Sequence, residues 1–156
     1  MGTRVQAILN PLFLYRYVVS NPINAVDPLG LSTFSLGLTV NIQLGPININ
    51  GFAGLAIDGN GGLGSYWGYG GGGGAGAKIS GGVNFASSNS ACIQDLEGPF
   101  GNTSASFGGG LNGSVDGFSG QGSQGQTVTG GGFTAGFGVG GGWSVGGSQT
   151  YVQPIW

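Results

Sequence analysis

From Phe34 to Leu44 the chain alternates strictly between apolar and small or polar residues, and no other feature constrains its fold as much. Six apolar side chains share one parity, and Ser, Gly, Thr, Asn and Gln fill the other. A period of two residues is typical of a β-strand with one apolar face. A second alternating run follows the Gly45-Pro46 turn and ends at Ile57. We therefore predict two consecutive strands joined by a tight turn.

The same pattern continues along the chain, with turn residues between the runs. Residues 58–62 read Asp-Gly-Asn-Gly-Gly, a strong hairpin signal because these residue types tolerate positive φ. A third strand is predicted from Leu63 into the glycine run at 70–74, and Val83 and Phe85 mark a shorter fourth strand.

The second half of the chain contains two stretches without alternation. Residues 87–102 and 117–126 are predicted to be loops, the first irregular and the second rich in Gly, Ser and Gln. Between them, residues 103–116 alternate. From Thr127 one parity stays apolar or aromatic for more than twenty residues, which predicts a long hairpin that turns near residues 140–142.

Glycine is the unusual component, because 37 of the 39 glycines follow residue 31 and only Gly2 and Gly30 precede it. Glycine inside a strand costs roughly 0.5–1 kcal/mol relative to alanine, so this number needs a compensating role. In the best segments glycine lies on the small face, which predicts either close backbone packing or a narrow polar lumen. We predict an all-β fold, a glycine-rich antiparallel meander that forms a small barrel or a sandwich, after a short irregular N-terminal segment.

Composition excludes several classes of function. The net charge is −2, and Lys78 is the only basic residue after Arg16, so the phosphate contacts of a nucleic-acid-binding protein are missing. The chain has no histidine, which removes the usual general base and the commonest metal ligand. No run of 18 apolar residues predicts a membrane-spanning helix.

Few residues are candidates for chemistry. Asp58 and Asp116 each precede glycine and are interpreted as turn residues. Cys92, Asp95 and Glu97 form the only compact reactive cluster, but no base is present that would activate the thiol. A hydrolase that uses Asp95 or Glu97 is a minor alternative. We predict no catalytic residue, no metal site and no cofactor. Matches to G-x-G-x-x-G are expected by chance in such a glycine-rich chain and do not indicate a dinucleotide-binding site.

A resemblance to a known family lies just before the alternating region. Residues 15–31 contain Tyr15-Arg16-Tyr17, Asn21-Pro22 and Asp27-Pro28-Leu29-Gly30-Leu31. Together they resemble the closing stretch of the RHS-repeat-associated core, the shell of Rhs/YD-repeat polymorphic toxins. The resemblance implies that residues 1–31 are a remnant of this core and that residues 32–156 are the variable toxin domain. It also implies a junction or autocleavage motif at Asp27, Pro28, Gly30 and Leu31; the alternative is that this motif is a tight turn ending the shell.

The resemblance implies an effector that is secreted, or delivered into a competing cell as part of a larger Rhs protein, with an immunity protein as partner. The period-two faces and the lack of His, Lys and Arg favour pore formation or membrane perturbation over nuclease activity. A soluble sandwich would bury the same apolar face against a second sheet. A surface or adhesive β module, or an inactive cassette, stays an alternative. The predicted lipid-facing residues are Trp67, Phe107, Phe133, Phe137 and Trp143.

Overall fold

The computed structural model describes residues 32–156, which form a single antiparallel sheet and one short 3₁₀ helix. The elements are β1 (Thr33–Leu44), β2 (Ile47–Asp58), β3 (Leu63–Ser88), η2 (Ile93–Leu96), β4 (Gly98–Gln121) and β5 (Thr127–Pro154). The prediction of an all-β antiparallel fold is confirmed. No helix within the described residues is long and apolar enough to cross a lipid bilayer.

The strand order is β1-β2-β3-β5-β4, and β1 also pairs with β3. The first half of β3 pairs with β2, from Leu63 opposite Ile57 to Gly73 opposite Ile47. Its second half pairs with β1, from Ala77 opposite Leu44 to Ser88 opposite Thr33. Because β1 and β2 are antiparallel to each other, the two halves of β3 must run in opposite directions. Strand β3 therefore encloses the β1–β2 hairpin between its two arms.

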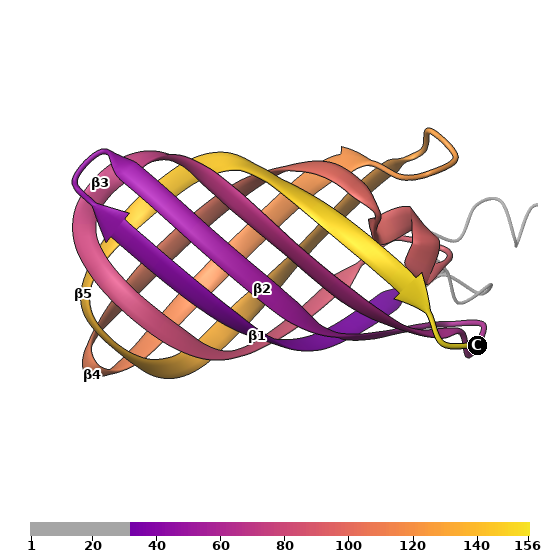
Figure 1. Cartoon of the computed structure of the whole chain (residues 1–156), viewed down its shortest axis with the longest axis horizontal. Coiled ribbons are helices and arrows are strands. Elements are labelled where there is room, and N and C mark those ends of the chain that lie inside the picture. The colour runs from indigo at the N-terminus through magenta and orange to yellow at the C-terminus, as the bar shows by residue number, and fades with distance from the viewer. Residues whose placement is uncertain (1–31) are drawn as a thin grey trace, which may run out of the picture.

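Strands β5 and β4 repeat this arrangement outside β3. Strand β5 pairs with β3 along both arms, and β4 pairs with β5 along both arms. The sheet thus consists of β1, β2 and two arms from each of the three longer strands, eight segments in all. The arms of β4 approach each other, since Thr103 Oγ1 donates a hydrogen bond to the carbonyl oxygen of Gly117 at 3.5 Å. The sheet is rolled into a cylinder whose strands run obliquely to its long axis (Figure 1).

The two ends of the cylinder differ in their connections. At one end, called the turn end, lie the β1–β2 turn and the bends of β3, β4 and β5 near residues 74–77, 107–111 and 139–143. All three bends contain glycine in backbone conformations that other residues rarely adopt, with φ of 124° at Gly76, 98° at Gly110 and 90° at Gly140. The other end, called the loop end, carries the connections 59–62, 89–97 and 122–126 and the C-terminal residue Trp156 (Figure 1).

Some segment boundaries differ from the sequence predictions. The segment around Val83 and Phe85 is the second arm of β3 rather than a separate strand. The prediction of loops at 87–102 and 117–126 is wrong in part, because β4 begins at Gly98 and continues to Gln121. The predicted turn at Asp116 is also wrong: this residue lies within β4. Glycine misled the prediction of the second loop, because 31 of the 37 glycines of residues 32–156 lie inside strands and only six lie between them.

The side chains are arranged around the cylinder with their apolar face outward. Along β1 the apolar residues from Phe34 to Leu44 are exposed, whereas Thr33, Gln43 and the small residues between them are buried or half-buried. The buried apolar residues form a single small cluster that includes Tyr66, Ile93 and Phe100. The sheet therefore presents polar and small residues to the lumen and apolar residues to the surroundings. Its buried apolar core is confined to the loop end.

Candidate functional site

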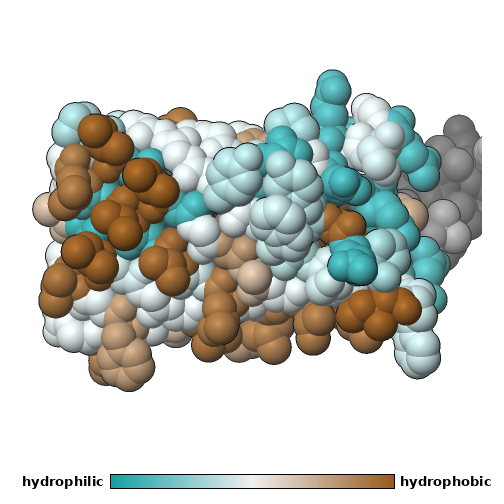
Figure 2. All heavy atoms as spheres, in the orientation of Figure 1, coloured by the Kyte–Doolittle hydropathy of each residue, from teal (hydrophilic) through white to brown (hydrophobic). Residues whose placement is uncertain are grey.

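The most prominent feature of the surface is an apolar belt formed by outward side chains of all five strands. Its members are large, at least 39% exposed and flanked along each strand by inward-facing small or polar residues. The belt comprises Phe34, Leu36, Leu38, Val40, Ile42, Leu44, Ile47, Ile49, Leu55, Ile57, Trp67, Tyr69, Ile79, Val83, Phe85, Phe107, Leu111, Val115, Phe133, Phe137, Val139, Trp143 and Val145. Figure 2 shows these side chains gathered toward the turn end and along one edge, with hydrophilic residues at the loop end.

The five residues predicted to face lipid all lie on this belt, with exposed fractions between 52% and 74%. They belong to three different strands: Trp67 is on β3, Phe107 on β4, and the others on β5. The structure therefore distributes them around the cylinder and does not bring them together into one pocket.

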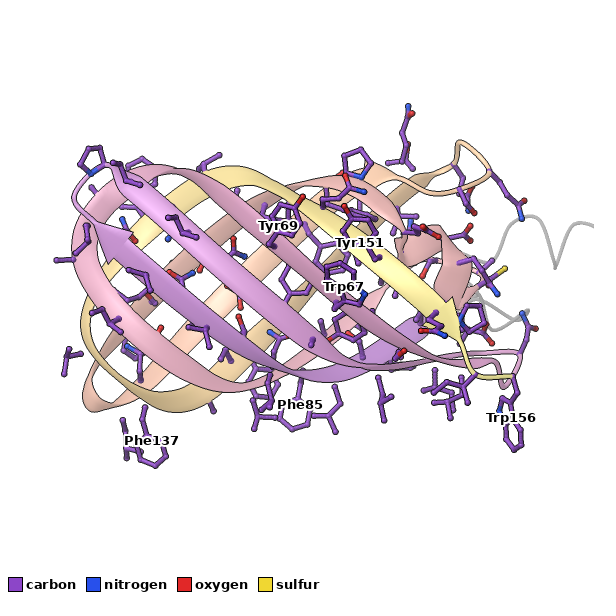
Figure 3. The ribbon with its side chains drawn as sticks, in the orientation of Figure 1. Trp67, Tyr69, Phe85, Phe137, Tyr151 and Trp156 are labelled. Carbon is purple, nitrogen blue, oxygen red and sulfur yellow. The ribbon has the colours of Figure 1, made fainter. Side chains whose placement is uncertain are left out.

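Two of these residues stack on aromatic neighbours that the sequence prediction did not include. Trp67 stacks on Tyr151 with ring centroids 4.3 Å apart, and Tyr69 lies 6.4 Å from the same ring. On another part of the belt, Phe133 stacks on Phe85 at 5.2 Å. Figure 3 shows the Trp67 cluster on the outer face of β3 and β5. Pairing across adjacent strands was hidden from sequence analysis because the partners are more than forty residues apart.

The height of the belt follows from strand geometry. Phe34 and Leu44 face outward at the two ends of β1 and are ten residues apart. At about 3.3 Å per residue, and with a strand tilt of about 40°, this run spans about 25 Å along the cylinder axis. An apolar band of about 25 Å is the height found on β-structures that cross a bilayer.

The inward face encloses a polar cavity of about 170 Å³, which has room for several water molecules. All five strands contribute to its lining, mostly with Asn, Ser, Thr and Gly. Lys78 and Asp116 also line it, and Lys78 is only 4% exposed. Lys78 is the only basic residue of this region, and its place in the lumen is not evident from the sequence. Asp116, which the sequence predicts to be a turn residue, also lies in the lumen.

Asp116 is held by a chain of hydrogen bonds across three strands. The hydroxyls of Ser114 and Thr134 donate to its Oδ2 at 3.1 and 3.2 Å. The Thr134 Oγ1 in turn accepts a hydrogen bond from Asn84 Nδ2 at 3.0 Å. Because two donors satisfy one carboxylate oxygen, Asp116 can remain inside the lumen without a direct cationic partner.

The lumen near the turn end is lined by amides. Gln43 is fully buried, and its Nε2 donates to the carbonyl oxygen of Trp143 at 3.1 Å. Its Oε1 has no hydrogen-bond partner among the described residues. Asn48 Nδ2 donates to Asn41 Oδ1 at 2.9 Å. Lys78 lies directly between Gln43 on β1 and Gly140 on β5 in the strand register. This section of the lumen thus offers a cation and amide groups to water or small polar solutes.

At the loop end, an apolar cluster and the segment that contains η2 occupy the cylinder. Ile93 and Leu96 pack with Tyr66, Phe100 and Val128. We call this cluster the plug. Because its residues are the largest buried apolar group of the described chain, the plug supplies the main apolar core of the fold.

Two buried carboxylates hold the plug in place. Asp58 Oδ1 accepts hydrogen bonds from the backbone N–H groups of Asn60 and Gly62, as expected of a turn residue, and its Oδ2 accepts one from Ile93 N–H at 3.3 Å. Asp95 accepts one from the Ser123 hydroxyl at 3.0 Å and one from Cys92 N–H at 3.3 Å. In these contacts both carboxylates have a structural role.

Cys92 lies beside these two carboxylates. Its thiol pKa is raised by burial and further by the negative charges of Asp95 and Asp58. A raised pKa keeps the thiol protonated at neutral pH and makes it a poor nucleophile. The nearby Glu97 side chain is exposed. Within residues 32–156, no group of three or more His, Cys, Asp or Glu side chains is placed to hold a metal ion.

The junction motif Asp27, Pro28, Gly30 and Leu31 lies outside the described residues. Comparison with known protein families, with curated proteins and with solved structures gives no match to the chain. The resemblance to the Rhs core therefore stays a prediction from residues 15–31.

Proposed function

We propose that residues 32–156 insert into a lipid bilayer as a cylinder and make it permeable to small ions. The observation that carries this proposal is the apolar belt, whose 23 large side chains face outward on all five strands. Exposing contiguous apolar area of this size to water is unfavourable, at roughly 25 cal/mol per Å². A bilayer removes the whole belt from water at once.

A bilayer suits this surface better than a protein partner does. A second sheet, as in a sandwich, covers one face of a flat sheet. Here the apolar side chains lie on β1 and β2 and also on arms of β4 and β5 elsewhere on the cylinder. The surrounding phase must therefore be apolar on several sides, and its thickness must be close to the belt height of about 25 Å.

The lumen supports the permeability part of the proposal. Strands that cross a bilayer alternate between apolar residues toward lipid and polar residues toward the interior. The cavity here is lined by amides, hydroxyls, Lys78 and Asp116. Its volume of about 170 Å³ fits water and small ions, not folded chains or large dyes.

The toxin context comes from the resemblance at residues 15–31. We propose that this domain is the C-terminal effector of an Rhs-type protein, that it acts in the envelope of a competing cell, and that an immunity protein protects the producer. The proposal gains support from the lack of any histidine and from the scarcity of basic residues, which leave little for nuclease chemistry.

Vesicles loaded with a pH-sensitive dye test the membrane activity. The full chain, added from detergent or denaturant, should collapse a proton or K⁺ gradient within minutes while the dye itself is retained. Release of the dye together with the ions would mean that the bilayer is disrupted and that the lumen is not the path. Intact gradients at every lipid composition tested would refute the proposed function.

Expression in bacteria tests the toxin context. The full chain should stop growth when it is produced either in the cytoplasm or with an export signal, because a membrane is reachable from both sides. If neither form affects growth although the purified protein permeabilises vesicles, the domain is a membrane module without toxicity. If neither activity is present, the alternative of a surface or adhesive module is favoured.

A further inference from the structure

The distribution of charge between the two ends of the cylinder is strongly unequal. Residues 32–156 contain five charged side chains. Lys78 and Asp116 line the lumen, and the remaining three, Asp58, Asp95 and Glu97, lie at the loop end. The four turns and bends of the turn end therefore contain no charged residue, and Lys78, which directly follows the β3 bend, is buried in the lumen.

The side chains of the turn end are also apolar. The connections read Leu-Gly-Pro-Ile at 44–47, Gly-Ala-Gly-Ala at 74–77, Phe-Gly-Gly-Gly-Leu at 107–111 and Val-Gly-Gly-Gly-Trp at 139–143. Every large residue in them is exposed. By contrast, the connections of the loop end are rich in Asn, Gln, Ser and Asp. Figure 2 shows the same polarity along the cylinder, with hydrophobic side chains near the turn end and hydrophilic ones at the loop end.

Several backbone groups of the turn end are hydrogen-bonded within the protein, as an apolar environment requires. Gly45 N–H donates to the carbonyl oxygen of Gly76 at 3.0 Å, and Gly74 N–H donates to that of Pro46 at 3.2 Å. Pro46 has no N–H to satisfy. Because unpaired backbone groups are the main obstacle to carrying a turn through hydrocarbon, these two bonds make passage of the β1–β2 and β3 tips easier.

The exposed aromatic side chains fit the same direction. Trp67, Tyr69 and Tyr151 form a cluster on the arms of β3 and β5 that end at the loop end. Trp and Tyr are enriched where a membrane protein meets the headgroup region. Trp67 and Tyr151 lie in the half of the cylinder nearer the loop end, so with the loop end on the side of entry they are closer to the headgroups of that side than to those of the far side.

We propose that the cylinder enters the bilayer with its turn end first, that this end crosses to the far leaflet, and that the loop end with the plug stays on the side of entry. The inference rests on the proposed insertion into a bilayer. It adds which end crosses and which surfaces remain accessible from the side of entry. It follows that an immunity protein acting from that side can reach only the loop end.

Site-directed thiol labelling tests this orientation in the full chain. Cys92 is the only cysteine, so Cys92→Ser provides a background without thiols. Gly109→Cys places a reporter at the turn end, where an added side chain meets nothing within 4 Å. Gln124→Cys places one on an exposed connection of the loop end. Each protein is added to preformed vesicles and then treated with a membrane-impermeant maleimide from outside.

The expected result is complete labelling at Gln124→Cys and less than one tenth of that labelling at Gly109→Cys, with full labelling of both after detergent. Labelling of Gly109→Cys combined with protection of Gln124→Cys would reverse the orientation and leave insertion standing. Equal labelling of both sites in intact vesicles, or protection of both, overturns the proposal. In the case of equal labelling, tryptophan quenching by brominated acyl chains shows whether the protein is inserted at all, so that failure of the orientation and failure of the proposed function are distinguishable.

Discussion

Leu38 is the most informative position at which to test the belt by substitution. It lies near the middle of β1, faces outward with 65% of its side chain exposed, and pairs in register with Ala53 and Val83. In water, replacing an exposed leucine by lysine changes the free energy of unfolding by no more than about 0.5 kcal/mol. At the middle of a bilayer, lysine on the lipid face of a β-cylinder costs about 2–4 kcal/mol.

This difference in cost gives the expected size of the effect on membrane binding. Since each 1.4 kcal/mol is a factor of ten, Leu38→Lys should lower the vesicle partition constant by about 30- to 700-fold. Ser87→Lys is the matched control, because Ser87 also faces outward but lies one residue from the loop end of β3. Near the interface the same lysine costs only about 0–1 kcal/mol, so the control should bind at most about fivefold more weakly than the natural chain.

The assay is a titration of each protein with lipid vesicles, followed by intrinsic tryptophan fluorescence. Circular dichroism in detergent micelles should show the same strand content for all three proteins, which excludes a folding defect as the cause. If Leu38→Lys binds vesicles as tightly as Ser87→Lys, the belt does not enter the hydrocarbon and the reasoning is refuted.

Three further changes test other parts of the account. Gly136→Ala should lower the free energy of unfolding by about 1–3 kcal/mol, because the added Cβ would collide with the backbone of Gly81 and Gly82. Urea titrations in micelles measure this change. The control is Gly109→Ala, whose Cβ meets no atom within 4 Å and which should have less than half that effect. Lys78→Gln should make the ion leak more selective for cations, because Asp116 is then the only charged residue that lines the lumen. The reversal potential in a salt gradient should move toward the equilibrium potential of the cation, and an unchanged reversal potential would exclude the lumen as the conduction path. The Cys92 thiol should react more slowly with a disulfide reagent at pH 8 than free cysteine does, and faster as the pH rises toward its raised pKa. Asp95→Asn removes one negative charge and should speed the reaction, and a rate equal to that of free cysteine would contradict the raised pKa.

The sequence predicted the strands better than it predicted their arrangement. Strict alternation identified β1 and β2 to within a residue, because a period of two residues is typical of β-strands and of few other backbone conformations. It predicted a turn near residues 140–142, where β5 bends at Gly140, but it did not show that β3 bends back at Gly76, since a glycine tract is equally compatible with strand, bend or loop. For the same reason the extension of β4 to Gln121 was missed.

The direction of the faces was also beyond sequence analysis. Apolar residues alternate in the same way in a strand that packs inside a sandwich and in a strand that faces lipid. Only the rolled sheet shows that Leu38 and the other apolar residues of its strand point outward. A narrow polar lumen was one of the two structures predicted from the glycine-rich face, but its lining residues were not identified, because its contacts join distant residues, such as Asn84 with Thr134, fifty positions apart. Asp116-Gly117 has the composition of a turn, and only the register of β4 against β5 places Asp116 in the interior.

Depth-dependent quenching of a single tryptophan measures whether the apolar belt contacts lipid hydrocarbon. Trp143 lies on the belt near the turn end, and Trp156 lies at the loop end. Proteins that retain only one of them, with the other tryptophans replaced by phenylalanine, are bound to vesicles whose acyl chains carry bromine. We predict strong quenching of Trp143 and little quenching of Trp156. An unquenched Trp143 in protein that has bound to the vesicles would contradict the account.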